Sequence, residues 1–275
     1  MNFWGEMKMK RIFALILALC MVVALAACGN TDTATKSEAT AESDFAYIQG
    51  QGKLIVGITD FAPMDYKENG EWIGFDADLA KEFCKSIGVE CQLVEIEWDS
   101  KELELQNKSI DCLWNGMTLT DGVKEAMATS KPYCNNAQII VIKKDNAGKV
   151  DNPDELAKLS IAVESGSAGM EAAKENGYNF VEVTSQANAV MEVASGTSDA
   201  CIIDSLMAAA MVGEGTSYPD LTITKSLTSE EYGVGFRKGS DMAEKLNDFL
   251  KKAYDDGTIM KIAEKYGTQA AIIAQ

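Results

Sequence analysis

Three short stretches of the chain place polar groups where a small molecule can bind. In residues 109–120 an apolar run ends at the turn Asn115-Gly116 and is followed by Thr118 and Thr120. Residues 164–169 read Glu-Ser-Gly-Ser-Ala-Gly, with hydroxyls and free N–H groups at a helix start, as in an anion-binding loop. Residues 199–204 form an apolar run that ends on Asp204. Because these groups come from two halves of the chain, we predict a ligand held between two lobes.

These stretches match no catalytic or nucleotide-binding motif. Residues 164–169 are not followed by Gly-Lys-Ser/Thr, and their spacing does not fit a Gly-x-Ser-x-Gly nucleophile elbow. The chain has no histidine, which excludes Ser-His-Asp and Cys-His catalysis and most zinc sites. The net charge of -17 argues against nucleic-acid binding and favours solubility. We therefore expect no metal, no cofactor and no nucleic-acid partner.

The elements that must position these groups alternate between strands and helices. Amphipathic stretches predict helices, the first of them capped by Asp76 and ended by Gly88. This alternation predicts an α/β fold with mostly parallel sheets flanked by helices. The strands fall into two groups with two hinge crossings, near 133–139 and 228–234. We predict lobe 1 at residues 45–137 and 229–275, and lobe 2 at 138–228.

The N-terminus predicts export. Basic residues at 8–11 precede an apolar run at 12–24 that is too short to span a membrane. The sequence Leu25-Ala26-Ala27-Cys28 resembles a bacterial lipobox, which implies removal of residues 1–27 and a lipid on Cys28. Residues 28–44 are almost all polar and are predicted to be a flexible tether. The odd number of other cysteines indicates no disulfide framework. A Cys84–Cys91 bridge is conceivable, but we expect it to be absent.

With these motifs, the chain resembles the extracytoplasmic solute-binding proteins of polar amino-acid ABC importers. The resemblance covers residues 52–267 and rests on residues 52–57, 72–80, 111–120, 130–133, 163–169, 203–204 and 256–266. It implies a periplasmic-binding-protein fold of type II, a two-lobe clamshell. It also implies that the protein captures an amino acid or related amine-bearing solute outside the cytoplasm, as a monomer. The solute would be delivered to an ABC permease and its ATPase.

The resemblance also implies a binding site. Phe61 and Trp98 would flank the ligand, Gly116 N–H and the Thr118 hydroxyl would bind its carboxylate, and Asp204 would pair with its ammonium. From the residues alone, the N-cap of a helix that begins at Ser205 is the better explanation of Asp204, and the resemblance reverses this preference. Other polar contacts are left open among Asn115, Asn136 and Gln138. The predicted ligand-binding residues are Phe61, Trp98, Asn115, Gly116, Met117, Thr118, Ser165, Gly166, Ser167, Ala168 and Asp204.

One position departs from the family pattern. Val123 stands where the family usually has an arginine that binds the ligand carboxylate, and an alkyl group cannot replace that bidentate pair. The identity of the solute is therefore open. Two other classes of function are possible on this scaffold: an enzyme of the dehydratase kind, and a sensor that presents its lobes to a receptor. An enzyme would need an acid–base pair, and Asp204 has no histidine partner, so we expect a binding protein.

Overall fold

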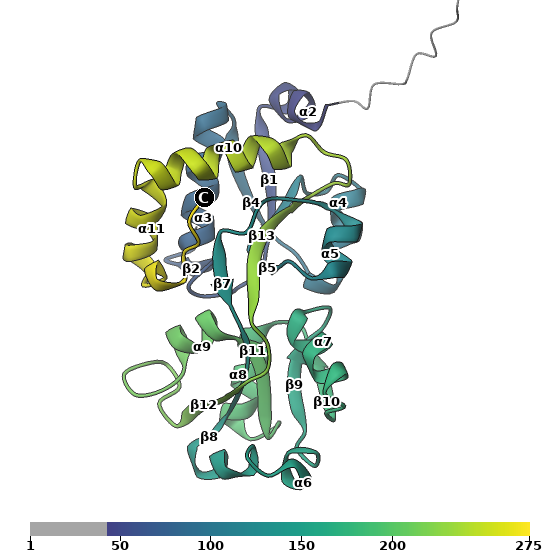
Figure 1. The fold of residues 1–275 in the computed structure, drawn as a ribbon, viewed down its shortest axis with the longest axis vertical. Helices are drawn as coiled ribbons and strands as arrows, with labels where there is room; N and C mark the ends of the chain where they lie inside the picture. The colour runs from purple at the N-terminus through teal and green to yellow at the C-terminus, as the bar shows by residue number, and fades with distance from the viewer. Residues whose placement is uncertain (1–42) are drawn as a thin grey trace, which may run out of the picture. The chain divides into compact units, whose positions relative to one another are not determined.

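A computed structural model describes residues 43–275. The predicted signal peptide, Cys28 and nearly all of the tether lie outside this range. Within it, none of the helices is both long enough and apolar enough to span a membrane. The structure contains two open sheets, each flanked by helices, stacked one above the other in Figure 1. This confirms the predicted α/β two-lobe fold.

The first sheet has the strand order β4-β1-β5-β13-β6, with β7 also paired to β13. Strands β1, β4 and β5 are parallel, whereas β13 runs antiparallel to β5, β6 and β7. A hairpin of β2 and β3 follows β1. The strands are β1 (Lys53–Ile58), β2 (Tyr66–Glu68), β3 (Glu71–Ile73), β4 (Glu90–Glu95), β5 (Cys112–Thr118), β6 (Ala128–Thr129), β7 (Cys134–Asn136) and β13 (Glu230–Phe236).

The second sheet has the order β10-β9-β11-β8-β12. Strands β9, β10 and β11 are parallel, and β8 runs antiparallel to β11 and β12. Both sheets are therefore mixed rather than mostly parallel, because β8 and β13, which lie next to the crossings between sheets, run against their neighbours. The strands are β8 (Gln138–Lys143), β9 (Ile161–Glu164), β10 (Phe180–Val183), β11 (Ala200–Asp204) and β12 (Leu221–Ser226).

Helices cover the sheets with apolar stripes. In the first lobe α3 packs on β4 and β5, and α10 packs on β13; in the second, α7 and α8 pack on β9 and β11. The largest fully buried side chain is Trp114 of β5. The helices are α2 (Asp44–Gln51), α3 (Phe75–Ile87), α4 (Lys101–Gln106), α5 (Asp121–Ala126), α6 (Pro153–Leu156), α7 (Ala168–Glu175), α8 (Gln186–Ser195), α9 (Ser205–Met211), α10 (Met242–Asp255) and α11 (Thr258–Tyr266), with 3-10 turns at Trp98–Ser100, Lys144–Lys149 and Gln269–Ala271.

The start of α3 corrects one prediction. Gly74, not Asp76, is the N-cap, with φ 135° in the region that favours glycine. A side chain at this position would overlap the Met64 carbonyl, since an added Cβ would lie 2.0 Å from its oxygen. Asp76 lies inside the first turn and is fully buried. Its carboxylate is therefore available to the interior of the first lobe.

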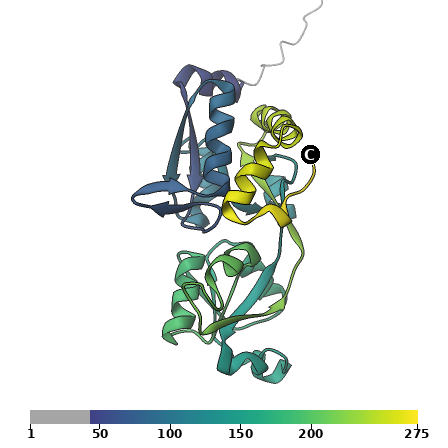
Figure 2. The ribbon, with the colours of Figure 1, turned by 90° about the vertical axis from the view of Figure 1, so that its left-hand side faces the viewer.

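The chain crosses between the sheets twice. It leaves the first sheet after β7 and enters the second at β8, with Ala137 between them, and it returns between β12 and β13. Figure 2 shows the two connections running side by side along one edge of residues 43–275. The second sheet is thus an insertion into the first, and its strands lie between the two crossings.

Candidate functional site

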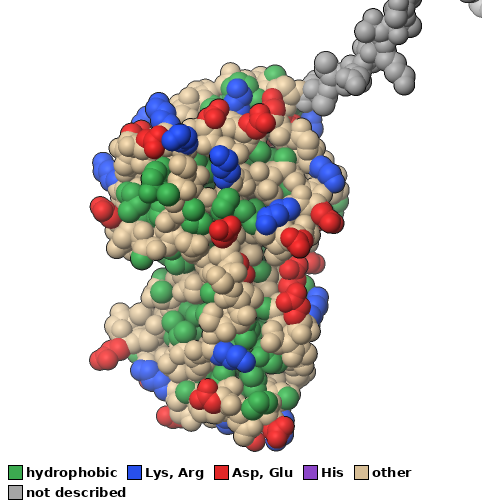
Figure 3. Space-filling model, viewed as in Figure 1, with side chains coloured by type: hydrophobic (Ala, Val, Ile, Leu, Met, Phe, Trp, Pro, Cys, Tyr) green, Lys and Arg blue, Asp and Glu red, His purple; other side chains and the backbone are tan. Residues whose placement is uncertain are grey.

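A cavity of about 380 Å³ lies between the two sheets and is lined from both. This volume is in the range of small-molecule sites. Figure 3 shows a constriction at this level on one face of the molecule, with acidic side chains beside it. All of the predicted binding residues except Ser165 line the cavity. The Ser165 hydroxyl instead donates a hydrogen bond to Glu182 at 2.5 Å.

Two aromatic side chains form part of the wall on the first lobe. Phe61 packs edge-on against Tyr232, with ring centroids 6.3 Å apart. Gly116 lets the Phe61 ring approach the backbone, because a Cβ at Gly116 would lie 2.5 Å from the Phe61 ring and its φ is +54°. Trp98 lies on the 3-10 turn after β4 and is almost fully buried. Both rings are thus held by packing before any ligand binds.

The first-lobe polar groups are largely engaged inside the protein. Asn115 accepts hydrogen bonds from the N–H and hydroxyl of Thr59 at 3.0 and 2.7 Å, and donates one to Asp65 at 2.7 Å. It therefore holds the loop that carries Phe61. The Thr118 hydroxyl donates to Glu230 at 2.9 Å. These side chains position the wall rather than standing free in the cavity.

Gly116 N–H donates to Asp76 at 2.6 Å, so the expectation that it faces a ligand carboxylate is not met in this structure. The hydroxyl of Tyr133 donates to the same carboxylate at 2.7 Å. Burial raises the pKa of Asp76 to about 7, against the opposing effect of these hydrogen bonds. The local sequence does not indicate that Asp76 accepts these two hydrogen bonds, because its partners are 40 and 57 residues away.

The second-lobe loop leads directly into α7. Ser167 is the N-cap of that helix, and its hydroxyl accepts a hydrogen bond from Met170 N–H at 3.1 Å. Gly166, Ser167 and Ala168 all line the cavity. The predicted strand–loop–helix arrangement therefore places the start of α7 against the cavity.

Asp204 ends β11 and is buried at the cavity wall. Its Oδ1 accepts hydrogen bonds from Tyr232 at 2.7 Å, Gln138 at 2.8 Å and Asn136. Its Oδ2 accepts a single hydrogen bond, from Gln186. Asp204 stands at the N-cap position of α9 but makes no side-chain cap hydrogen bond, so the N-cap explanation is wrong.

The charge environment of Asp204 is acidic. Burial and the nearby Glu230 carboxylate raise the pKa of Asp204 to about 7, although its hydrogen bonds to Tyr232, Gln186 and Gln138 oppose this rise. Asn136 and Gln138 each donate to both Asp204 and Glu230. The sequence left it open whether these two amides contact the ligand. In the structure they instead bridge two carboxylates near the crossings.

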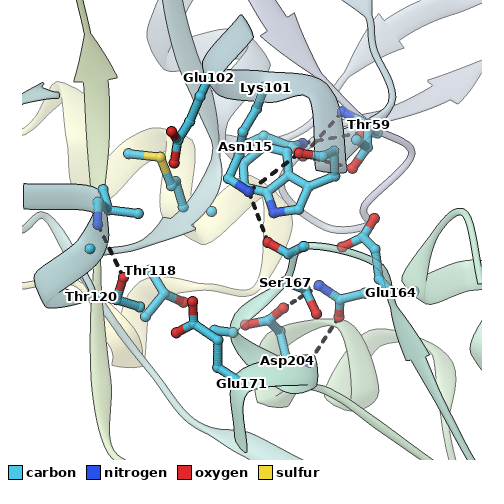
Figure 4. A pocket seen from close by; sticks show the side chains of 18 of the residues that line it. Thr59, Lys101, Glu102, Asn115, Thr118, Thr120, Glu164, Ser167, Glu171 and Asp204 are labelled. Atoms are coloured by element: carbon cyan, nitrogen blue, oxygen red, sulfur yellow. Dashed lines mark hydrogen bonds between the residues drawn. The ribbon is translucent and has the colours of Figure 1, made fainter. Parts of the chain in front are cut away.

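Of the charged cavity residues that the sequence did not predict, Lys101 and Glu164 are the buried ones among residues 43–275. Lys101 is 9% exposed, and its Nζ donates to the carbonyl oxygens of Gly166 at 2.8 Å and Trp98 at 3.3 Å. Burial lowers the pKa of Lys101. Glu164 ends β9 as Asp204 ends β11 (Figure 4), and that position at a strand end was a usable signal. Lys101 lies on a polar helix and gave no such signal.

Two further observations bear on the chemistry. Val123 lines the cavity, and none of its lining residues in the described part of the chain is an arginine. No group of three or more His, Cys, Asp or Glu side chains within residues 43–275 is arranged to hold a metal ion. The arrangement is therefore suited to enclosing a small polar molecule between aromatic rings and carboxylates.

This geometry agrees with comparisons to known proteins. Residues 54–269 match the model of the bacterial extracellular solute-binding proteins, family 3. The chain belongs to this family, and it is a solute-binding protein of the kind that serves ABC transporters.

Individual relatives share this fold and class. The arginine-binding extracellular protein ArtP of Bacillus subtilis is 30% identical, over 94% of this chain and 99% of ArtP. A P235GK mutant of the protein ArgBP from T. maritima is 34% identical, with a TM-score of 0.75 over 82% of this chain and 99% of that one. The ancestral amino acid-binding protein AncCDT-1, described as a precursor of cyclohexadienyl dehydratase, is 34% identical, with a TM-score of 0.74 over 82% and 99% of the two chains. All three are named for binding, which favours a binding protein over an enzyme.

Proposed function

We propose that this protein binds an amino acid or related amine-bearing solute outside the cytoplasm and delivers it to an ABC permease with its ATPase. The proposal rests on membership of a family of extracellular solute-binding proteins and on relatives named for arginine or amino-acid binding. A lipid on Cys28 would hold the protein at the membrane as a monomer. A Cys28→Ser variant that stays membrane-bound would contradict this anchor.

Asp204 is the observation that carries the proposal. A buried carboxylate held by four neutral side chains is already oriented, so a ligand does not have to order it. Its Oδ2 has one donor within residues 43–275 and keeps acceptor capacity, and the residue lines the cavity. An ammonium group supplies the positive charge that this acidic environment lacks. Phe61 and Trp98 would flank the apolar part of the solute.

Binding would close the two lobes, 45–137 with 229–275 and 138–228, about the crossings. The two connections are the parts of the backbone between the sheets, so a rotation there changes the cavity without changing either sheet. The bound solute would also raise the melting temperature by mass action. Small-angle scattering should show a more compact particle with any solute that raises the melting temperature; an unchanged particle would count against closure.

The test begins with a thermal-shift screen of amino acids, opines, short peptides and amines, followed by calorimetry. For the solute found, Asp204→Asn should weaken binding by roughly thirtyfold or more, since one partner of a buried charge pair is lost. Asp248→Asn, an exposed change on α10, is the matched control and should bind as the parent does. An Asp204→Asn protein that is folded and binds as tightly as the parent would refute the ammonium site.

A further inference from the structure

Glu164 is a second carboxylate of the cavity, and like Asp204 it interacts with Gln186. It is 3% exposed, and its Oε1 has no hydrogen-bond partner. Glu164 lines the same cavity as Asp204. An unpartnered buried carboxylate oxygen is costly to desolvate, so it is a position where a bound cation restores lost interactions.

Glu164 and Asp204 are brought to one edge of the second sheet by its topology. Each is the last residue of its strand, and β9 and β11 are neighbouring parallel strands. Figure 4 shows that both side chains lie at the cavity. The pKa of Glu164 is raised to about 8, mainly by burial and next by the charge of Asp204. The charge of one acid therefore disfavours ionisation of the other.

The protein offsets the charge of this pair only in part, because the ammonium of Lys101 lowers the pKa of Glu164. Among residues 43–275, Lys101 is the single basic residue that lines the cavity, and its Nζ donates to two backbone carbonyl oxygens. No ion pair within 4.0 Å joins Lys101 to Glu164 or Asp204, both of which belong to the described chain. The cavity is lined by this one basic residue and by five acidic residues: Glu102, Glu125, Glu164, Glu171 and Asp204. The cavity is therefore built for a ligand with more than one positive charge.

We propose that Glu164 binds a second positive nitrogen of the solute, so that the ligand is a small organic molecule with two cationic nitrogens (called a dication here whether or not it also has a carboxylate), one at Asp204 and the other at Glu164. This inference rests on the proposed function and narrows its substrate class. Two kinds of molecule carry this chemistry: a basic amino acid and a diamine that has no carboxylate. They differ by one group, so matched compounds separate them.

The experiment measures binding of four compounds by calorimetry: arginine, its neutral isostere citrulline, agmatine, which is arginine without the carboxylate, and cadaverine. We expect at least one dication to bind the parent roughly thirtyfold or more tightly than citrulline, by the strength of a buried charge pair. If arginine binds tightly, the solute belongs to the basic amino acids. If agmatine or cadaverine binds tightly and arginine binds weakly, the solute is a diamine.

Variants locate the second nitrogen. Glu164→Gln should remove most of the preference for the dication over citrulline, and Glu164→Asp, which keeps the charge, should retain part of it. Glu175→Gln, an exposed change on α7, is the matched control and should keep the full preference. Melting temperatures of all variants verify that they are folded.

Two outcomes would overturn the inference. A neutral solute that binds the parent as tightly as every dication would refute the second cation site and leave the proposed function standing. An unchanged preference in folded Glu164→Gln would refute the role of Glu164 in the same way. Failure of the proposed function looks different, because then no solute of the wider screen, charged or neutral, would raise the melting temperature.

Discussion

Lys101 Nζ on the first lobe donates a hydrogen bond to the carbonyl oxygen of Gly166 on the second lobe, at 2.8 Å. The ammonium is buried, and it also lies 5.0 Å from the centroid of the Trp98 ring. A hydrogen bond that involves a charged group contributes about 1.5–3 kcal/mol to stability. This contact therefore joins the two lobes across the cavity.

The first prediction is that Lys101→Met shifts the ligand-free protein toward separated lobes. The variant loses the bond to Gly166 while keeping much of the apolar stem. Small-angle scattering of the ligand-free protein should give a larger radius of gyration than the parent. Lys85→Met, an exposed change on α3, is the control. Identical scattering of Lys101→Met and parent would show that this bond does not hold the lobes.

The second prediction concerns pH. Burial is the largest cause of the raised pKa values of Asp204, to about 7, and Glu164, to about 8. Their folded pKa values exceed their ordinary ones, so their stability contribution is present in acid and is lost as pH rises from about 4 to about 8. A cation prefers both ionised forms. Its binding should therefore release protons near pH 7, and its affinity should increase between about pH 6 and 9.

Calorimetry at pH 7 in two buffers of different ionisation enthalpy measures the released protons. Arginine or agmatine, whichever binds, is the ligand to use. Glu164→Gln should release fewer protons than the parent, because one of the two groups is gone. Zero release at pH 7, together with an affinity that does not change with pH, would mean that both carboxylates are already ionised before the ligand arrives.

The third prediction tests Val123. Its side chain is 8% exposed, lies on α5 and lines the cavity. Val123→Arg would offer a guanidinium to a ligand carboxylate, and such charge-assisted pairs are among the strongest hydrogen bonds. The affinity for arginine relative to agmatine should rise by roughly tenfold or more. Val123→Met is the size control. An unchanged ratio, measured by calorimetry, would place the carboxylate of a bound amino acid elsewhere.

The fourth prediction separates stability from binding. Arg237 donates to Asp111 and Asp44, each at 3.1 Å, and the Asp111 side chain is fully buried. Arg237→Gln leaves Asp111 without its ionic partner, which should lower the free energy of unfolding by about 3–5 kcal/mol. Affinity for the solute should not change, because Arg237 does not line the cavity. Urea unfolding measures this loss, with exposed Lys238→Gln as control; equal unfolding midpoints would contradict it.

The sequence predicted those parts of the site that local patterns encode. An apolar run with a polar last residue marked Asp204, and a Gly/Ser stretch before a helix marked residues 165–168, of which 166–168 line the cavity. Both features depend on neighbours in the chain. The two-lobe α/β class followed in the same way, from the alternation of short apolar runs with amphipathic stretches.

The remaining parts depend on contacts that are distant in the sequence. Asp76 looked like a helix cap because aspartate commonly stands there, but Tyr133 and Gly116 bind it in the core. The mixed sheets follow from the crossings, which no local pattern shows. Lys101 enters the cavity only because the second lobe supplies a carbonyl acceptor, Gly166. Such partners are known only once the fold has brought them together.

The position of β13 has a consequence for the order in which the molecule is built. This strand pairs with β5, β6 and β7 in the first sheet, yet it is made after every strand of the second. A chain emerging from its N-terminus can complete the second sheet while β5 still lacks its partner on one side. Sheet formation in the first lobe must then wait for a contact of high sequence separation, which is slow to form. The lobe that is synthesised first is therefore the lobe that finishes folding last.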